Sequence, residues 1–331
     1  MRKFIILSLI LCLAVSCQAA PTLETDESSV PITSQLSDLD KYDILDLGDQ
    51  IQLVDELGER VTLPKRPQRV VCGYNSYVDL WYKLGGELVG RIKPSPDKPV
   101  PAAEGVDIIG DNKALNEEII LSLEPDLVIL ASGNNQLLTA ENLKQADIPT
   151  LVIDAKDLAE YVRLVRVLSA ILDDETAYQE LGVEVEQEVK SIIDRVPKTE
   201  APKILLMNNT TTAVNVSSSQ NMTGEMLRDL GAINLADGVI ESDQSAAFSL
   251  EQILIEDPDV IFLREMGSDS QKVRETRQKE IEDSPVWQTL RAVQNDAFYI
   301  LDKDLFTFKP NERYAEAYLS LAKILYPESF E

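Results

Sequence analysis

The chain has 331 residues, of which 57 are acidic, 31 are basic and none is histidine, and this length suffices for one large domain or two lobes. Without histidine, the sequence excludes a Ser-His-Asp or Cys-His relay and a histidine-liganded zinc site. The formal charge of −26 argues against binding to nucleic acid, which requires clustered lysine and arginine side chains.

Residues 1–16 are predicted to be an export signal. A basic start is followed by an almost uninterrupted apolar stretch over residues 4–15, which is too short to span a bilayer as a permanent helix. The boundary Ala14-Val15-Ser16-Cys17 resembles a bacterial lipobox. It predicts that Cys17 is lipidated and becomes the first residue of the mature protein. An ordinary secretory signal, cleaved near residue 19 or 20, is the alternative.

Residues 17–49 are predicted to be a lipidated acidic tether. Eight acidic side chains oppose the single Lys41 between residues 18 and 49, and so polar a stretch buries too little apolar surface to fold alone. As a flexible coil it would reach about 30 Å. We therefore expect an exported protein, anchored by lipid to the outer face of the cell membrane, on the extracellular surface or in the periplasm.

From residue 50 onwards the pattern is α/β. Short apolar runs of the doubly buried type alternate with helical stretches, which predicts parallel strands joined by crossover helices. A long helix over residues 174–196, ending at Pro197, separates the two sets of strands. The expected hairpin comprises residues 51–54 and 61–63, and the other expected strands are 70–73, 126–131, 150–153, 203–207, 260–263 and 297–301.

The two halves of the chain share a repeated segment. Residues 118–130 align without gaps on residues 251–263, with identical residues at six positions that include the leading glutamate and a Pro-Asp pair. Leu84-Gly85 and Leu230-Gly231 form a second pair, each at the end of a predicted helix where glycine serves as the cap. Chance similarity between two βα units is the alternative, but two pairs in the same order favour a duplication.

Five segments in order resemble the substrate-binding lipoproteins of ABC importers for iron-siderophores, haem and cobalamin. The similarity covers residues 50–331, although Asp147 replaces a glycine that is usual in that family. The resemblance implies an α/β fold of two Rossmann-like lobes joined by a single long backbone helix, with the lobes at 50–154 and 198–331 and the helical connection at 155–197. The segments that carry it are 61–71, 116–128, 148–153, 224–234 together with 249–251, and 285–295.

The resemblance also implies partners and a function. We expect a monomeric solute-binding protein without catalytic activity, which delivers an iron complex to the transmembrane subunits of an ABC permease with a cytoplasmic ATPase. In this family one surface glutamate on each lobe docks on permease arginines, and Glu118 and Glu251 occupy equivalent places in the repeat. The helix dipole also favours glutamate at these positions, which is the structural alternative.

Ligand-binding side chains are expected in loops at the carboxyl ends of the strands. Tyr74 and Tyr77 are the expected aromatic side chains of the cleft, with core packing as the alternative. The stretch from Asn208 to Met222 offers uncharged hydrogen-bonding groups, with a plain surface hairpin as the competing interpretation. The predicted ligand-binding residues are Tyr74, Asn75, Tyr77, Asn112, Asn134, Asn209, Met222, Arg264, Phe306 and Lys309.

The expected ligand is a ferric siderophore. Haem with a histidine axial ligand is excluded, whereas haem held through Tyr74, Tyr77 or Met222 remains an alternative, as does cobalamin. A preassembled ferric chelate needs no metal ligand from the protein and no resident cofactor. Basic residues are scattered among the candidate loops, which disfavours an anionic catecholate. An exported carboxylate-based hydrolase and an anchored scaffold are the alternatives from other classes.

Overall fold

The computed structural model describes residues 42–330 except 134–135, 199, 239, 241–244, 247–249 and 268, with backbone only at 245–246. The predicted signal, Cys17 and most of the tether lie outside the described residues. Within the described part of the chain, no helix is long and apolar enough to cross a membrane.

The N-terminal lobe begins with a three-stranded antiparallel sheet, β1 (Leu45–Asp46), β2 (Gln50–Val54) and β3 (Arg60–Pro64). The hairpin predicted at residues 51–63 is therefore confirmed. The predicted tether was too long, because β1 lies inside it and pairs with β2. Ile44, 4% exposed, anchors this segment in the core, and Asp46 accepts a hydrogen bond from Gly48 N in the turn between the strands (2.8 Å).

A five-stranded parallel sheet follows, in the order β10-β9-β4-β5-β6. Strands β4, β9 and β10 are wholly buried, as their continuous apolar runs predicted, although β10 lies at the edge of the sheet. The strands are β4 (Val70–Cys72), β5 (Gly90–Arg91), β6 (Asp107–Ile108), β9 (Leu127–Leu130) and β10 (Thr150–Val152), accompanied by helices α2 (Asn75–Lys83), η2 (Pro101–Ala103), α3 (Glu117–Ser122) and α4 (Gln136–Gln145) and by the hairpin β7 (Gly110–Asp111) and β8 (Ala114–Leu115).

The C-terminal lobe has a six-stranded sheet in the order β14-β12-β11-β15-β16, with β13 also paired to β11. Strands β11, β13, β15 and β16 are parallel, whereas β12 and β14 are antiparallel to their neighbours, so the predicted alternation holds for only part of this sheet. The strands are β11 (Lys203–Asn209), β12 (Val214–Ser217), β13 (Ile233–Asn234), β14 (Ser245–Ala246), β15 (Val260–Glu265) and β16 (Phe298–Ile300).

Helices surround this second sheet. They are α8 (Met222–Asp229), η4 (Leu235–Gly238), α9 (Leu250–Glu256), α10 (Ser270–Arg277), η5 (Gln278–Glu282), η6 (Trp287–Thr289), α11 (Arg291–Gln294), α12 (Lys303–Phe306), η7 (Asn311–Arg313) and η8 (Pro327–Ser329).

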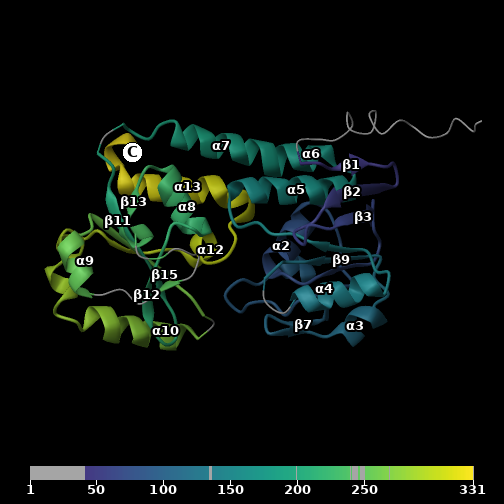
Figure 1. The fold of residues 1–331 in the computed structure, drawn as a ribbon, viewed down its shortest axis with the longest axis horizontal. Coiled ribbons are helices and arrows are strands. Elements are labelled where there is room, and N and C mark those ends of the chain that lie inside the picture. The colour runs from purple at the N-terminus through teal and green to yellow at the C-terminus, as the bar shows by residue number, and fades with distance from the viewer. Residues whose placement is uncertain are drawn as a thin grey trace, which may run out of the picture. The chain divides into compact units, whose positions relative to one another are not determined.

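Long helices join the lobes. After α5 (Leu158–Leu172), Asp173 adopts a left-handed conformation (φ +60°) and Asp174 caps the next helix by accepting a hydrogen bond from Ala177 N (3.0 Å). This helix runs without a break through α6 (Glu175–Tyr178), the π-helical segment η3 (Gln179–Val183) and α7 (Glu184–Ile193), and ends four residues before Pro197. Figure 1 shows α7 and α13 (Tyr314–Leu325) side by side. One hydrophobic cluster extends from β4 and α2 through α5, α7 and α13 to β11 and α8, so these helices brace both lobes.

The repeat has an equivalent structural role in each lobe. Gly85 and Gly231 both end their helices with positive φ, +86° and +79°. Asp126 accepts hydrogen bonds from Gln68 N (2.7 Å) and Arg69 N (2.8 Å) at the entry to β4, and Asp259 accepts one from Lys203 N (2.9 Å) at the start of β11. In each half, the aspartate of the repeated Pro-Asp pair thus accepts hydrogen bonds from the start of the strand that neighbours its own strand.

Candidate functional site

A cavity of about 250 Å³ lies between the two lobes. Most of its walls come from the ends of parallel strands or from the segments that follow them, as expected for an open α/β arrangement, whereas residues 220–222 follow the antiparallel strand β12. The N-terminal lobe contributes Tyr74 after β4 and Lys156 after β10, and the C-terminal lobe contributes the rest. We call this cavity the cleft, and its lining comprises Tyr74, Lys156, Gln220, Asn221, Met222, Arg264, Phe306, Thr307 and Lys309.

Half of the predicted ligand-binding residues line the cleft. They are Tyr74, Met222, Arg264, Phe306 and Lys309. Four others lie elsewhere: Tyr77, Asn75, Asn112 and Asn209. The tenth, Asn134, lies outside the described residues.

Tyr77 was wrongly assigned to the cleft. It is 1% exposed, packs in the hydrophobic core of the N-terminal lobe, and its hydroxyl donates a hydrogen bond to Ile153 O (3.1 Å). The ring of Tyr74 lies against it, with 4.7 Å between ring centroids. The two tyrosines are three residues apart, yet only the first, at the N-cap of α2, reaches the cleft.

The three asparagines have structural positions. Asn75 accepts a hydrogen bond from Arg91 Nη2 (3.0 Å) and donates one to Lys98 O (3.0 Å), which binds the start of α2 to neighbouring loops. Asn209 is fully buried in β11 and donates to a backbone carbonyl in α10 (2.9 Å). Asn112 is exposed in the turn between β7 and β8. A polar residue after a strand was thus an insufficient signal for the cleft.

Sequence reasoning did not single out four residues of the lining. Gln220 and Asn221 fall inside the candidate stretch from Asn208 to Met222, and Thr307 follows the predicted Phe306, whereas Lys156 was missed altogether. The feature that could have identified Lys156 is its position four residues beyond the end of β10. Lys156 pairs with Asp154 (3.1 Å), which also accepts a hydrogen bond from Ser132 N (2.9 Å).

The side chain of Arg264 is the strongest electrostatic feature of the cleft. It extends from β15, is 8% exposed, and donates hydrogen bonds to the neutral oxygens of Asn208 (2.9 Å), Ser217 (3.4 Å) and Thr223 (3.5 Å). Burial lowers the pKa of the guanidinium to about 10. Among the described residues no carboxylate pairs with it, so its charge is buried without compensation, which is costly unless an anion binds.

Lys309 adds a second partly buried cation. Its ammonium group donates a hydrogen bond to Ala155 O in the N-terminal lobe. Burial lowers its pKa, although the nearby Asp154 and Glu160 carboxylates oppose the change. Lys309 O in turn accepts a hydrogen bond from Lys98 Nζ (2.8 Å). The segment that carries Lys309 therefore joins the lobes as well as lining the cleft.

The cleft is cationic although the chain is strongly acidic. Three basic side chains line it and its lining contains no carboxylate, although Asp154 pairs with Lys156 beside the lining, while the whole chain carries a formal charge of −26. The scattering of basic residues along the sequence therefore does not predict the charge of the cleft, because Lys156, Arg264 and Lys309 converge in space. In the described part of the chain, no group of three His, Cys, Asp or Glu side chains could hold a metal ion.

Polar contacts around the cleft hold the lobes together. Asn311 Nδ2 donates to Ser76 O (3.0 Å), and Lys303 pairs with Asp97 (3.0 Å). Lys83 on α2 pairs with Glu312 (2.6 Å). The segment from β16 to α13 is thus fastened to the N-terminal lobe at several points.

The two repeat glutamates lie where the sequence placed them. Glu118 is in the first turn of α3 and Glu251 is in the first turn of α9, and both are exposed. In α3, Asn116 caps the helix by accepting a hydrogen bond from Ile119 N (3.1 Å). The position of the repeat that corresponds to Asn116 is Ser249, which lies outside the described residues.

Comparisons with known proteins agree with this architecture. The model of a periplasmic binding protein family matches residues 70–305. The chain belongs to this family. Its function is that of the solute-binding component of an ABC importer, an exported protein that carries a small molecule to a membrane permease.

Individual relatives have low sequence identity and long coverage. The Fe(3+)-citrate-binding protein YfmC of Bacillus subtilis is 26% identical over 260 residues, which cover 76% of this chain and 78% of that protein. The structure of Staphylococcus aureus SirA complexed with staphyloferrin B has a TM-score of 0.65 at 22% identity and covers 83% of this chain and 97% of the other. The structure of S. aureus IsdE complexed with heme has a TM-score of 0.66 at 21% identity, and the match covers 78% of this chain and 98% of the other. The structural likenesses establish the fold of two lobes.

Proposed function

We propose that the protein captures a small anionic ferric chelate of the carboxylate type in the cleft and presents it to an ABC permease. The observation that carries this proposal is the convergence of Lys156, Arg264 and Lys309 around a cavity whose lining has no carboxylate. A chelate with carboxylate arms would place a negative charge beside Arg264, whose buried charge has only neutral partners.

The chemistry of the lining favours an iron complex over a bare ferric ion. Three cationic side chains repel a free metal cation and attract the anionic chelator that surrounds it. Tyr74 and Phe306 supply aromatic surface, and Gln220, Asn221 and Thr307 supply neutral hydrogen-bonding groups. Similarity to YfmC, a protein named for binding Fe(3+)-citrate, supports the same ligand class.

Haem and cobalamin are less well matched to this cavity. Its volume of about 250 Å³ is below the range of roughly 300–1,000 Å³ usual for ligand pockets. Haem held by Tyr74 would need the phenolate, but burial and then the Asp154 carboxylate raise the pKa of Tyr74. Tyr77 is buried in the core. Similarity to IsdE keeps haem as the alternative that an experiment must test.

We also propose that the protein has no catalytic activity and no resident cofactor. Its family consists of binding proteins. A carboxylate-based hydrolase would need two acids facing its substrate, and the side chains that line the cleft are cationic, amide, hydroxyl, thioether and aromatic.

Glu118 and Glu251 are proposed to dock on cationic side chains of the permease. Their equivalent positions on the two lobes fit a partner that contacts both lobes at once. Leu121 and Leu254, three residues further along their helices, are also equivalent and are 47% and 37% exposed. An acidic group beside an exposed leucine is thus repeated on both lobes. Such exposed charges set orientation and partner choice more than stability.

We further propose a monomer, anchored to the outer face of the membrane by lipid on Cys17. The sequence of the signal and its boundary supports this anchor, and the acidic segment after it would act as the tether.

Calorimetric titration of the purified protein tests the ligand assignment. Ferric citrate is expected to bind saturably and more tightly than iron-free citrate, haemin or cyanocobalamin at the same ionic strength. Tight binding of haemin with none of ferric citrate would overturn the assignment in favour of haem. Turnover of a glycan substrate, with no binding of any of the four, would favour the hydrolase.

A further inference from the structure

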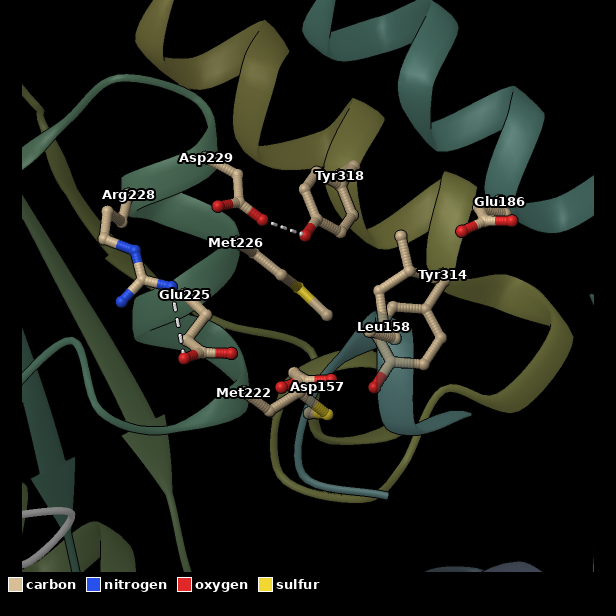
Figure 2. A pocket seen from close by; sticks show the side chains of 11 residues that line it. Asp157, Leu158, Glu186, Met222, Glu225, Met226, Arg228, Asp229, Tyr314 and Tyr318 are labelled. Atoms are coloured by element: carbon tan, nitrogen blue, oxygen red, sulfur yellow. Dashed lines mark hydrogen bonds and ion pairs between the residues drawn. The ribbon is translucent and has the colours of Figure 1, made fainter. Parts of the chain in front are cut away.

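A second cavity, of about 270 Å³, lies among the helices that join the lobes. Its walls come from the start of α5, from α7, from α8 and from α13, as Figure 2 shows. Met222 lines both this cavity and the cleft, so the two are neighbours on either side of one side chain. We call it the helix cavity.

The helix cavity is acidic, in contrast to the cleft. Asp157, Glu186, Glu225 and Asp229 line it, together with one basic residue, Arg228, which pairs with Glu225 (3.1 Å). Burial and then the charge of Asp157 raise the pKa of Glu225. The carboxylates therefore act on one another across the cavity, and a bound cation would relieve their repulsion.

Tyr314 supplies an observation independent of this charge. It is 1% exposed, it lines the helix cavity, and its hydroxyl has no hydrogen-bond partner among the residues that the structure describes. One turn further along α13, Tyr318 is satisfied because its hydroxyl donates to Asp229 (2.8 Å). In Figure 2 the Tyr314 hydroxyl points towards the side of the cavity where Asp157 and Met222 lie. A buried hydroxyl without a partner is costly, so this one is placed for a ligand that supplies a polar hydrogen or an acceptor.

The remaining walls suit a ligand that also has an alkyl part. Met226 extends between the two tyrosine rings and the carboxylates, and Leu158 and Met222 add apolar surface. Tyrosine faces attract cations, and methionine adapts to alkyl chains of varied shape. A metal ion would gain nothing from these apolar groups.

We infer that the helix cavity is a binding site for a primary organic ammonium ion, distinct from the cleft. The ammonium group donates N–H hydrogen bonds to the carboxylates of Asp157 and Glu225 and to the hydroxyl oxygen of Tyr314. The alkyl part packs against Met226 and the tyrosine rings. This site does not depend on the ligand of the cleft, and either assignment can fail without the other.

Calorimetric titration with n-butylammonium chloride at fixed ionic strength tests the inference. The wild type is expected to bind it saturably, and Tyr314→Phe and Glu225→Gln are each expected to bind about tenfold more weakly, because each loses one hydrogen bond to a charged group. Tyr314→Phe removes only an unpaired hydroxyl from the free protein, so its melting temperature without the probe is expected to stay the same or rise. The probe should then raise the melting temperature of the wild type more than that of the variant.

Matched controls separate a site from general charge attraction. Glu188→Gln changes the same charge at an exposed position of α7 outside the cavity, and it is expected to bind the probe like the wild type. Tetramethylammonium, which has no N–H donor, and 1-butanol, which has no charge, are expected to bind at least several-fold more weakly. The inference is overturned if the wild type shows no saturable binding, if either control probe or Mg²⁺ binds as tightly, or if Tyr314→Phe retains full affinity.

Discussion

Replacement of Arg264 by methionine should make the free protein more stable and the complex weaker. The side chain is 8% exposed, and its hydrogen bonds go to three neutral oxygens. Its charge is thus desolvated on folding without a counter-charge. Methionine keeps an unbranched side chain of adaptable shape at this position while removing the charge.

The size of the stability effect follows from the pKa of the guanidinium. Burial lowers this pKa from its ordinary value to about 10, and at 1.36 kcal/mol for each tenfold change in the protonation equilibrium the charged form loses about 3 kcal/mol on folding. Because the folded-state pKa is the lower one, this cost is fully present below pH 10 and disappears as the pH rises towards the unfolded value. Removal of the donor to Asn208, which is buried, returns about 1 kcal/mol of the gain. The net expectation is a free energy of unfolding higher by about 1–2 kcal/mol.

The affinity should change in the opposite direction. Truncation of one partner of a buried, hydrogen-bonded charge pair costs about 2–5 kcal/mol. This corresponds to a dissociation constant for ferric citrate that is about 30-fold to several thousand-fold higher. Loss of affinity with gain of stability distinguishes a residue that binds an anion from one that holds the fold together.

Urea unfolding of the ligand-free protein and calorimetric titration with ferric citrate measure the two effects. Arg274→Met, at an exposed position of α10, changes the same charge away from the cleft and should alter neither quantity appreciably. The reasoning is refuted if Arg264→Met binds ferric citrate as tightly as the wild type, or if it leaves the free energy of unfolding unchanged or lowers it.

Three further predictions follow from the site. Reversal of both Glu118 and Glu251 to lysine should abolish transport in cells and leave ligand affinity in solution unchanged; reduced affinity in the purified double variant would contradict the docking proposal. Tyr74→Ala should weaken ligand binding about tenfold or more, whereas Tyr77→Phe should lower the free energy of unfolding by about 1 kcal/mol and leave the affinity unchanged. Titration and urea unfolding of both variants test this. Equal affinities of Tyr74→Ala and the wild type would count against the cleft position of Tyr74. Burial lowers the pKa of Lys309 below 10.5, so affinity for the anionic chelate should fall as the pH rises through this pKa, while the free protein gains stability over the same pH range. Titrations of the wild type with the chelate between pH 7 and 10 should show this fall in affinity. An identical pH profile in Lys309→Met would assign the fall to another group.

The sequence by itself determined the longer buried strands and the long helix between the lobes, whereas the short strands β5–β8, β13 and β14 were not predicted. Continuous apolar runs such as those at β4, β9 and β15 mark strands that are buried on both faces, and this pattern is readable without tertiary information. The gapless repeat predicted that Glu118 and Glu251 would begin equivalent helices, because the surrounding residues have the same local preferences in both halves. The absence of histidine excluded whole classes of site from the start.

The sequence-based predictions of ligand-binding residues were wrong where two residues had equivalent local sequence patterns. Tyr74 and Tyr77 follow the same strand within one short stretch, and only the packing of α2 on the sheet decides which ring enters the core. Asn75, after β4, hydrogen-bonds to the backbone of a neighbouring loop, and Asn209 is buried because β11 extends two residues beyond the predicted strand.

The tertiary structure alone decided the character of the cleft. Lys156, Arg264 and Lys309 are separated by up to about 150 residues along the chain, and nothing in their local sequence distinguishes them from other basic residues. Parallel strands from both lobes end at the cleft, which brings these charges together and removes water from Arg264. The net charge of −26 follows from composition, whereas the potential at a site depends on distance and burial, which only the folded chain defines.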